Sequence, residues 1–278
     1  MVKIKFWKMH GLGNDYIVID DKEELIKNPE EKAKKFCRRR FSIGADGLIL
    51  LQKPIFNQAD FKMRIFNKDG SEAEMCGNGI RCAAKFYYEI NKPNKKELIV
   101  ETKAGLKKVW LKIENEKVKE VEVNMGKPIF ERKLIPMLGE GLFINEEIKV
   151  ENKVFRATCL SMGNPHCVIF VDDIENFPVK EVGSKIEKHS LFPKRVNVEF
   201  VKVLNKNTLN VRVWERGCGE TLACGTGACA SAVVSNLLNK TENEVLVKLK
   251  GGKLKIKISD EVLMRGPAVK VFEGEIEA

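Results

Sequence analysis

The sequence predicts an α+β protein of two pseudo-symmetric halves, each a curved mixed or antiparallel sheet wrapped around one central helix. Three observations predict this fold: an internal repeat, many segments that alternate apolar and polar residues, and only two convincing helical patterns. The repeat aligns FKMRIFNKDGSEAEMCGNG (61–79) with LNVRVWERGCGETLACGTG (209–227). Cys76 therefore aligns with Cys224, 148 residues further along (224 − 76). Because the spacing is constant through both segments, we interpret the chain as two copies of one unit.

The repeat also gives the domain limits. GNDYIVID from Gly13 resembles GNPHCVIFVD from Gly163, 150 residues further along (163 − 13). A chain of 278 residues is long enough for two domains with a core each. NMGKPIF and RGPAVKVF are the expected ends of the two units. We predict a first domain of residues 1–125 with the tail 266–278, whose alternating VFEGEIEA pairs back onto it, and a second domain of residues 126–265.

Strands dominate both halves. Alternation with period two places successive side chains on opposite faces of a sheet, and many segments show it. They are KMRIFN, LIVET, KKVWLKI, VKEVEVNM, NVRVWER, EVLVKLK and KLKIKISD. The lysines of KLKIKISD are expected on the solvent side of the second sheet.

Two helices follow the aligned cysteines. The first is predicted to begin near Gly77, because Ile80, Ala83, Ala84 and Tyr87 form an apolar stripe at helical spacing. The second begins near Gly225 and is almost wholly apolar through ACASAVVSNLL. A helix that is apolar on all sides is a buried helix, so each sheet is expected to wrap around one of the two.

Composition excludes several classes of protein. The net charge is +10, but the lysines alternate with glutamates as on a solvated surface, which argues against nucleic acid as a partner. No apolar run reaches the ~18 residues of a membrane span, and MVKIKFWKMHG lacks the apolar core of a signal peptide, so we expect a cytoplasmic protein. Eight cysteines without a C-x-x-C pair predict neither a metal site nor a disulfide framework.

Each of the two aligned cysteines directly precedes a glycine-containing helix start. Small residues let a ligand approach the first backbone N–H groups, and the helix N-terminus attracts an anion such as a carboxylate. The same field favours a thiolate, so both cysteines are expected to ionise more readily than a free thiol. Two thiols that face one carbon from opposite sides suit a reaction in which a proton leaves one face and returns to the other. A single CGxG segment would more simply be a buried cysteine at a glycine turn.

Polar residues flank the cysteines at matching places. Asn67 and Glu215 each continue the apolar face of a strand, nine residues before Cys76 and Cys224. Such a residue either ends a strand at the surface or contacts a ligand. Arg216 offers a planar fork for a carboxylate, although most arginines simply lie at the surface. The remaining candidates, which also have ordinary structural interpretations in turns and at strand ends, are Asn14, Asn164 and His166.

Six segments together resemble the diaminopimelate epimerase family. They are KMHGLGNDYIVID, RFSIGADGLILL, MRIFNKDGSEAEMCGNGIRC, SMGNPHCVIF, FPKRVNVEFV and VWERGCGETLACGTGACA, which extend over nearly the whole chain. The resemblance implies two similar domains with the active site in the cleft between them. It also implies an isomerase of lysine biosynthesis that converts LL-diaminopimelate to the meso isomer without a cofactor, one cysteine removing the α-proton as thiolate and the other delivering a proton as thiol.

The resemblance assigns roles to the candidate residues. It makes Cys76 and Cys224 the catalytic pair, supported by His166 and Glu215, and it makes the helix starts at Gly77, Asn78, Gly225 and Thr226 the ligands of the reacting carboxylate. The distal amino-acid head is assigned to Asn67, Asn197, Glu215 and Arg216, with Asn14 and Asn164 lining the site. Some family members carry glutamine where this chain has Gly47, so a contact from that side chain is not expected.

Other functions stay open at this point. A proline or hydroxyproline racemase would use two thiols as well, but its small substrate would leave Arg216 and the asparagines without a role. A nucleic-acid-binding protein and a thiol-redox protein both leave the paired CGxG segments unexplained. Apart from the small-molecule substrate, the partner that stays open is a second copy of the chain, in a homodimer.

Overall fold

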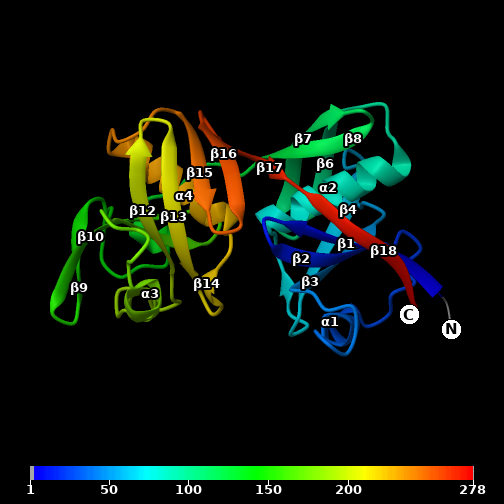
Figure 1. Cartoon of the computed structure of the whole chain (residues 1–278), viewed down its shortest axis with the longest axis horizontal. Helices are drawn as coiled ribbons and strands as arrows, with labels where there is room; N and C mark the ends of the chain where they lie inside the picture. Colours follow the sequence, from blue (N-terminus) through cyan, green and yellow to red (C-terminus); the bar gives the residue numbers. More distant parts are fainter. Residues whose placement is uncertain (1–2, 278) are drawn as a thin grey trace. The chain divides into compact units, whose positions relative to one another are not determined.

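The chain forms two compact units in a computed structural model, which describes residues 3–277. The first unit runs to Asn124 and resumes at Arg265, and the second unit comprises Met125–Met264 (Figure 1). These limits lie one residue from those expected of the two domains. That the two units are the two predicted domains stays a prediction.

Unit 1 is built on one mixed sheet. Its strands are paired in the order β18-β1-β2-β3-β4-β6-β7-β8, in which β2–β3 and β4–β6 are parallel and the other pairs are antiparallel. The short strand β5 forms an antiparallel pair with β4. The strands are β1 (Lys3–Gly11), β2 (Asn14–Asp20), β3 (Gly47–Gln52), β4 (Phe61–Asn67), β5 (Glu72–Ala73), β6 (Glu97–Thr102), β7 (Gly105–Glu114), β8 (Lys117–Asn124) and β18 (Val269–Glu277).

Unit 2 repeats this connectivity. Its strands are paired in the order β9-β10-β11-β12-β13-β15-β16, with β11–β12 and β13–β15 parallel, and β14 pairs with β13. The parallel pairs thus fall at the same places as in unit 1, as a duplicated unit requires. The strands are β9 (Glu146–Val150), β10 (Lys153–Ser161), β11 (Pro165–Phe170), β12 (Asn197–Asn205), β13 (Thr208–Glu215), β14 (Gly219–Thr221), β15 (Glu244–Leu249), β16 (Gly252–Ile258) and β17 (Val262–Pro267), the last of which extends across the unit boundary.

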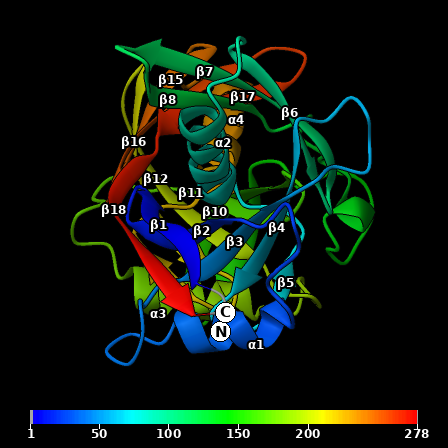
Figure 2. The same cartoon turned by 90° about the vertical axis from the view of Figure 1, so that its right-hand side faces the viewer.

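Each sheet packs against one central helix, as predicted. In unit 1, α2 (Gly77–Asn91) contacts β8, β1 and β2 (Figure 2). In unit 2, α4 (Gly225–Leu237) contacts β16, β12 and β11 and is buried over most of its length. Both helices begin at the glycine that the sequence indicated. On β16 the lysines at 253, 255 and 257 are exposed while Leu254 and Ile256 are buried, which confirms the solvent side of this strand.

Two helices were not predicted: one presents few apolar residues, whereas the other carries a buried stripe of Val179, Val182 and Ile186 at helical spacing that the sequence analysis missed. The first is α1 (Pro29–Phe36), in which only Ala33 and Phe36 are buried. The second is α3 (Val179–Glu187), which includes a glycine, Gly183, because a Cβ there would lie 2.7 Å from the Cβ of Trp214. A single 3-10 turn, η1 (Arg132–Leu134), follows the start of unit 2.

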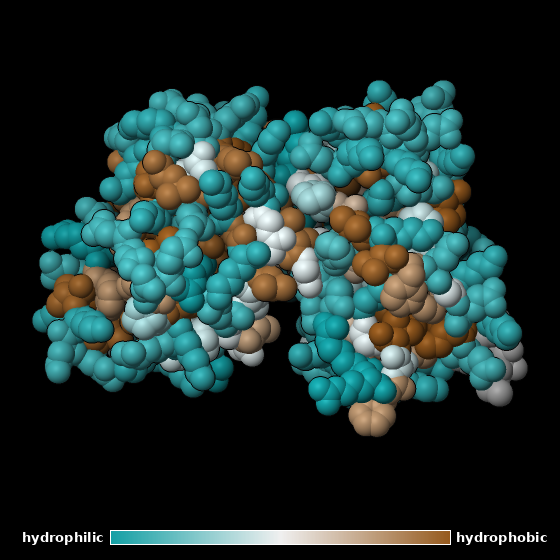
Figure 3. All heavy atoms as spheres, in the orientation of Figure 1, coloured by the Kyte–Doolittle hydropathy of each residue, from teal (hydrophilic) through white to brown (hydrophobic). Residues whose placement is uncertain are grey.

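The C-terminal strand returns to the start of the chain. β18 runs antiparallel to β1, from Lys3 opposite Glu277 to His10 opposite Val269, as the alternating tail predicted. Among residues 3–277, no helix is both long enough and apolar enough to cross a membrane. Figure 3 shows a largely hydrophilic face on which hydrophobic residues lie in scattered groups.

Candidate active site

Cys76 is held at the start of the central helix of unit 1. It is the N-cap of α2, with an extended backbone (φ −142°, ψ 124°), and the strands β4 and β5 lead the chain to this point. One turn into the helix, Gly79 lies so close to the sheet that a Cβ would meet the Cδ1 atoms of Ile65 at 3.0 Å and Ile49 at 3.2 Å. Because Gly79 has no side chain, the start of α2 approaches the sheet closely. This close packing sets the position of Cys76 relative to the sheet.

The structure brings Cys76 together with Asn14, Asn78 and a tyrosine. The Cys76 sulfur lies 3.0 Å from the hydroxyl of Tyr16 and 4.0 Å from Asn14 Oδ1. That same Asn14 oxygen accepts hydrogen bonds from the Tyr16 hydroxyl and, at 3.4 Å, from Asn78 Nδ2. The sequence analysis did not single out Tyr16. The signal was present, since Tyr16 aligns with His166 in the GNDY and GNPH segments of the repeat.

The side-chain amide of Asn14 is oriented by a charged cluster. Asn14 Nδ2 donates to Asp46 Oδ2 at 3.0 Å, and Arg39 bridges Asp46 and Asp15 at 3.0 and 2.6 Å. Burial alone would raise the pKa of Asp15, but hydrogen bonds from Arg39 and Lys8 outweigh it and lower the pKa to about 2. Asp15 is therefore ionised at neutral pH and holds this cluster, and with it Asn14, in one arrangement.

Cys224 is the N-cap of α4, at the matching place in unit 2. Its sulfur accepts a hydrogen bond from the backbone N–H of Gly227 at 3.4 Å and lies 3.4 Å from Thr226 Oγ1. The side chain is nearly enclosed, with Cys224 only 5% exposed.

The prediction that the thiol ionises more readily than a free thiol is wrong for Cys224. Burial raises the pKa of this thiol well above its usual value, and the carboxyls of Glu215 and Glu199 raise it further. The helix-start donors at Thr226 and Gly227 act in the expected direction but are outweighed. The prediction included the electrostatic field of the helix. It did not include the desolvation of the sulfur, because the burial of this side chain is not evident from the sequence.

Glu215 lies beside this thiol at the end of β13. Burial raises the pKa of Glu215 above its usual value, while hydrogen bonds with Thr221 and Cys224 act in the opposite direction. The Thr221 hydroxyl donates to Glu215 Oε1. The carboxyl predicted to help set up the cysteine is thus in contact with it.

His166 and Glu199 form a buried pair beneath the same helix start. Both side chains are fully buried, and His166 Nδ1 lies 2.7 Å from Glu199 Oε1. On its other side, His166 Nε2 lies 2.9 Å from Asn164 Oδ1, so the structure brings these two candidate residues together, and their roles stay predictions. A Cβ on Gly227 would lie 2.7 Å from Glu199 Oε1, which places this carboxylate directly against the first turn of α4.

The sequence analysis missed Glu199. It is a single acidic residue inside the otherwise apolar run VEFV (198–201), and an acidic residue in a buried strand requires a partner. In the strand registers Glu199 lies opposite Val168, and Ile49 lies opposite Val18 at the equivalent place in unit 1. The second unit therefore carries a carboxylate where the first carries an aliphatic side chain.

The predicted distal residues are distributed over both units. Asn197 accepts a hydrogen bond from the backbone N–H of Arg216 at 2.9 Å and donates to the Pro165 carbonyl at 2.8 Å, so its amide fixes the backbone of Arg216. The Arg216 guanidinium is exposed and donates to the Lys194 carbonyl. In unit 1 Asn67 is exposed, and its amide donates to Ser71.

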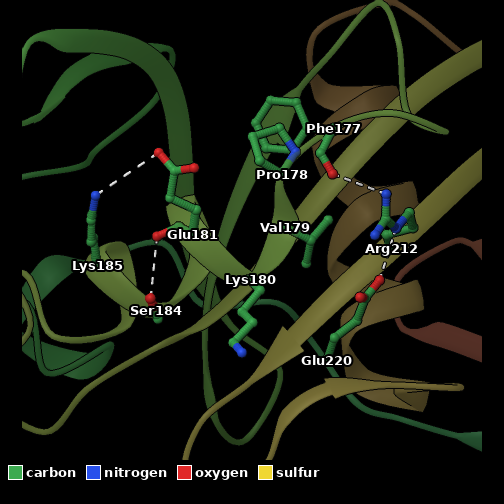
Figure 4. A pocket seen from close by; sticks show the side chains of 9 residues that line it. All are labelled: Phe177, Pro178, Val179, Lys180, Glu181, Ser184, Lys185, Arg212 and Glu220. Atoms are coloured by element: carbon green, nitrogen blue, oxygen red, sulfur yellow. Dashed lines mark hydrogen bonds and ion pairs between the residues drawn. The ribbon is translucent and has the colours of Figure 1, made fainter.

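A shallow groove of unit 2 lies away from these residues. Figure 4 shows it between α3 and β13, with Arg212 turned toward the Phe177 carbonyl and Glu220. Arg212 bonds Glu220 at 2.8 Å and three backbone carbonyls, so its donors are occupied by the protein itself. Among the described residues, no group of three or more His, Cys, Asp or Glu side chains is arranged to hold a metal ion.

The model of the diaminopimelate epimerase family matches residues 6–131 and 158–271, which include every predicted site residue. The chain belongs to this family. Curated family members include the diaminopimelate epimerases of Acetivibrio thermocellus, 51% identical with 99% of each chain covered, and of Methanococcus maripaludis, 49% identical with 99% of this chain and 100% of the relative covered.

Solved structures with low sequence identity to this chain share its fold. A hydroxyproline epimerase from Agrobacterium vitis has a TM-score of 0.72 at 14% identity, covering 99% of this chain and 91% of that one. A PhzF-family phenazine biosynthesis protein from Bacillus anthracis has a TM-score of 0.72 at 17% identity, covering both chains completely. At such identities the likeness shows the fold alone, and it confirms the mixed α+β fold with two related halves.

Proposed function

We propose that this chain interconverts LL-diaminopimelate and meso-diaminopimelate, with Cys76 and Cys224 as the two proton-transfer groups. Membership of the diaminopimelate epimerase family supports the substrate. One observation carries the mechanism: each cysteine is the N-cap of the central helix of its unit. The proposed reaction uses no cofactor, as the family resemblance implies.

In the proposed reaction the α-carbon loses a proton from one face and gains a proton on the opposite face. The Cys76 thiolate removes the α-proton, so that an S–H bond forms as the C–H bond breaks. The electron pair left on carbon then takes the proton of the Cys224 thiol from the opposite face, which leaves Cys224 as thiolate. The reverse reaction exchanges the two roles.

The carbanion is stabilised through the reacting carboxylate. Backbone N–H groups at the two helix starts, from Gly77 and Asn78 and from Gly225 and Thr226, donate to its oxygens as charge develops there. One such preorganised donor contributes about 3 kcal/mol in an oxyanion hole. The donors act more strongly when water is excluded.

The local environment of Cys224 supports its role as the resting acid. Its pKa is raised by burial and by the carboxyls of Glu215 and Glu199, so the sulfur retains its proton at neutral pH. His166 and Glu215 serve in this assignment as supporting residues. In the direction that begins with Cys76 as base, Cys224 already carries the proton that the product needs.

The distal amino-acid head is assigned to Asn67, Glu215, Arg216 and Asn197, while Asn14 and Asn164 line the site. Arg216 can bind a carboxylate through two parallel hydrogen bonds. Asn197 contributes by holding the Arg216 backbone at 2.9 Å. A homodimer and a cytoplasmic location stay predictions that accompany this function.

The decisive experiment is epimerisation of LL-diaminopimelate in deuterated water at low conversion, without added pyridoxal phosphate. Two thiols on opposite faces place solvent deuterium in the meso product and little in recovered substrate. Equal early labelling of substrate and product would contradict the two-thiol mechanism. Cys76→Ala and Cys224→Ala are each expected to abolish turnover, whereas Cys218→Ala, at an exposed thiol, leaves it unchanged.

The same assay separates the proposal from a proline or hydroxyproline racemase. A small substrate with one amino-acid head would leave Arg216 and the distal asparagines without a ligand. We therefore expect no turnover of either amino acid. Racemisation of proline at a rate comparable to that of diaminopimelate would overturn the assigned substrate.

A further inference from the structure

Tyr16 occupies the place in unit 1 that the repeat gives to His166 in unit 2. Tyr16 lies opposite Gly47 in the parallel pair β2–β3, and His166 lies opposite Asn197 in the parallel pair β11–β12. In unit 2 the imidazole bonds Asn164 and Glu199. In unit 1 the equivalent side chain places a hydroxyl between Asn14 and the Cys76 sulfur, in direct contact with the latter at 3.0 Å.

The phenol ring is fixed at this place by close packing. Tyr16 is 4% exposed. A Cβ on Gly47 would lie 2.7 Å from the Phe66 carbonyl and 3.3 Å from two carbons of the Tyr16 ring. The missing side chain at Gly47 therefore leaves the room that the ring occupies, and burial holds the ring there.

The partners of the Asn14 side-chain amide determine which hydrogen bonds the Tyr16 hydroxyl can form. Asp46 accepts only, so the Asn14 amide must turn its NH2 group toward Asp46 and its oxygen toward Tyr16. While Cys76 is a thiol, its S–H can donate to the tyrosine oxygen, and the tyrosine donates to Asn14. Once Cys76 is a thiolate, the single hydroxyl hydrogen can turn to the sulfur, because Asn78 Nδ2 remains as a donor to the Asn14 oxygen at 3.4 Å.

We propose that Tyr16 is a catalytic hydrogen-bond donor, whose hydroxyl stabilises the thiolate form of Cys76. The inference rests on the proposed function of Cys76 in proton transfer. Burial, followed by the influence of Cys76, Cys82 and Asp46, raises the pKa of Tyr16 well above its usual value, so the group stays a phenol and donates. Cys82, whose pKa burial raises to about 12, stays a thiol beside it.

The test is the pH dependence of alkylation at Cys76 in Tyr16→Phe. The full-length reduced protein is treated with iodoacetamide from pH 5 to 10, and the modified Cys76 peptide is measured by mass spectrometry. Tyr16→Phe removes a hydrogen bond to the charged sulfur, which makes the thiolate less stable. We therefore expect the midpoint of the Cys76 profile to rise by about one to two pH units. A midpoint equal to that of the wild type would overturn the proposal.

Two controls belong to this measurement. Tyr87→Phe removes the hydroxyl of a tyrosine that stacks on Phe61 in the same unit, and it should leave the Cys76 midpoint unchanged. Cys218 is exposed and is read in the same digests, so a shift at Cys218 as well as Cys76 would mean a general change rather than a lost contact. That result would also overturn the assignment.

A second variant strengthens the donor instead of removing it. The chain has three tyrosines, at positions 16, 87 and 88, so 3-fluorotyrosine incorporated into the Tyr87→Phe, Tyr88→Phe double variant labels Tyr16 alone. A more acidic phenol of nearly the same size should lower the Cys76 midpoint, opposite to Tyr16→Phe. An unchanged midpoint in this folded, nearly isosteric protein would overturn the proposal even if Tyr16→Phe failed to fold.

Epimerase activity separates this inference from the proposed function. Tyr16→Phe is expected to lower kcat/KM for LL-diaminopimelate by roughly 10- to 100-fold. If Cys76→Ala retained activity, the proposed function would fall, yet the alkylation profile would still decide the Tyr16 hydrogen bond. If Cys76→Ala abolished activity while Tyr16→Phe left both profile and kcat/KM unchanged, only the Tyr16 proposal would fall.

Discussion

Glu199 and Ile49 make the two thiol environments chemically different at the residue scale. Both side chains lie beneath the first turn of a central helix, where the Cβ of a substituted glycine would meet them. The aliphatic side chain contributes packing only. The carboxylate opposes ionisation of the neighbouring thiol and holds His166 at 2.7 Å. A duplicated scaffold thus surrounds its two equivalent thiols with different neighbours.

Glu199→Gln should make Cys224 easier to ionise. The substitution keeps the shape and an acceptor for His166 Nδ1 but removes the negative charge that raises the pKa of Cys224. We expect the midpoint of Cys224 alkylation against pH to fall by roughly one unit. Glu175→Gln, at an exposed carboxylate of the same unit, is the matched control and should not move it. A Cys224 profile unaffected by Glu199→Gln would refute the electrostatic role of this residue.

At the element scale, the elements that could be predicted are those with a regular pattern of apolar residues or with apolar residues throughout. In β16 exposed lysines alternate with buried Leu254 and Ile256, and α2, which is buried from Gly77 to Phe86, carries an apolar stripe at helical spacing, so sequence alone located both. The helix α1 buries only Ala33 and Phe36 and gives no such pattern. Asn14 and Asn164 were found through the repeat, whereas Glu199 was missed because the repeat has no acidic residue at the matching place. The partner of Glu199 is His166 on another strand, and the residues around Glu199 in the sequence do not identify it.

The two helix starts offer a matched comparison in Gly79→Ala and Gly227→Ala. At Gly79 the new methyl group meets the ends of two isoleucine side chains at 3.0 and 3.2 Å, which can yield by a small shift. At Gly227 it meets Glu199 Oε1 at 2.7 Å and Cys224 Sγ at 3.3 Å, and Glu199 is fixed by His166. Overpacking of this kind costs about 1 to 3 kcal/mol.

Gly227→Ala should therefore loosen the first turn of α4 more than Gly79→Ala loosens that of α2. Native-state hydrogen exchange measures each helix separately within one protein. We expect a clear loss of protection at the start of α4 and little change at the start of α2. Equal effects at the two helices would mean that the carboxylate beneath α4 can move aside, contrary to the packing described for it.

The whole molecule is discontinuous in sequence, because unit 1 is completed by the last strand of the chain. β18 pairs with β1 along its length, and Phe272 packs edge-on against Phe6 with ring centroids 6.0 Å apart. Arg265 ties the returning chain to Glu122 of β8 at 2.7 Å. The first unit thus cannot complete its sheet until β18, which follows the whole of unit 2 in the chain, is available.

Ending the chain after Ala268 should destabilise unit 1 and spare unit 2. The truncation removes every partner of β1 on its β18 side, which exposes backbone N–H and C=O groups and the buried side chain of Phe6. Hydrogen exchange should show lost protection throughout β1, while β11, β12 and β13 keep theirs. Val271→Ser, which alters an exposed side chain but keeps the backbone pairing, is the control for side-chain effects. If β1 kept its protection in the truncated chain, β2 alone would suffice to hold it, and the closing strand would be dispensable for the fold of unit 1.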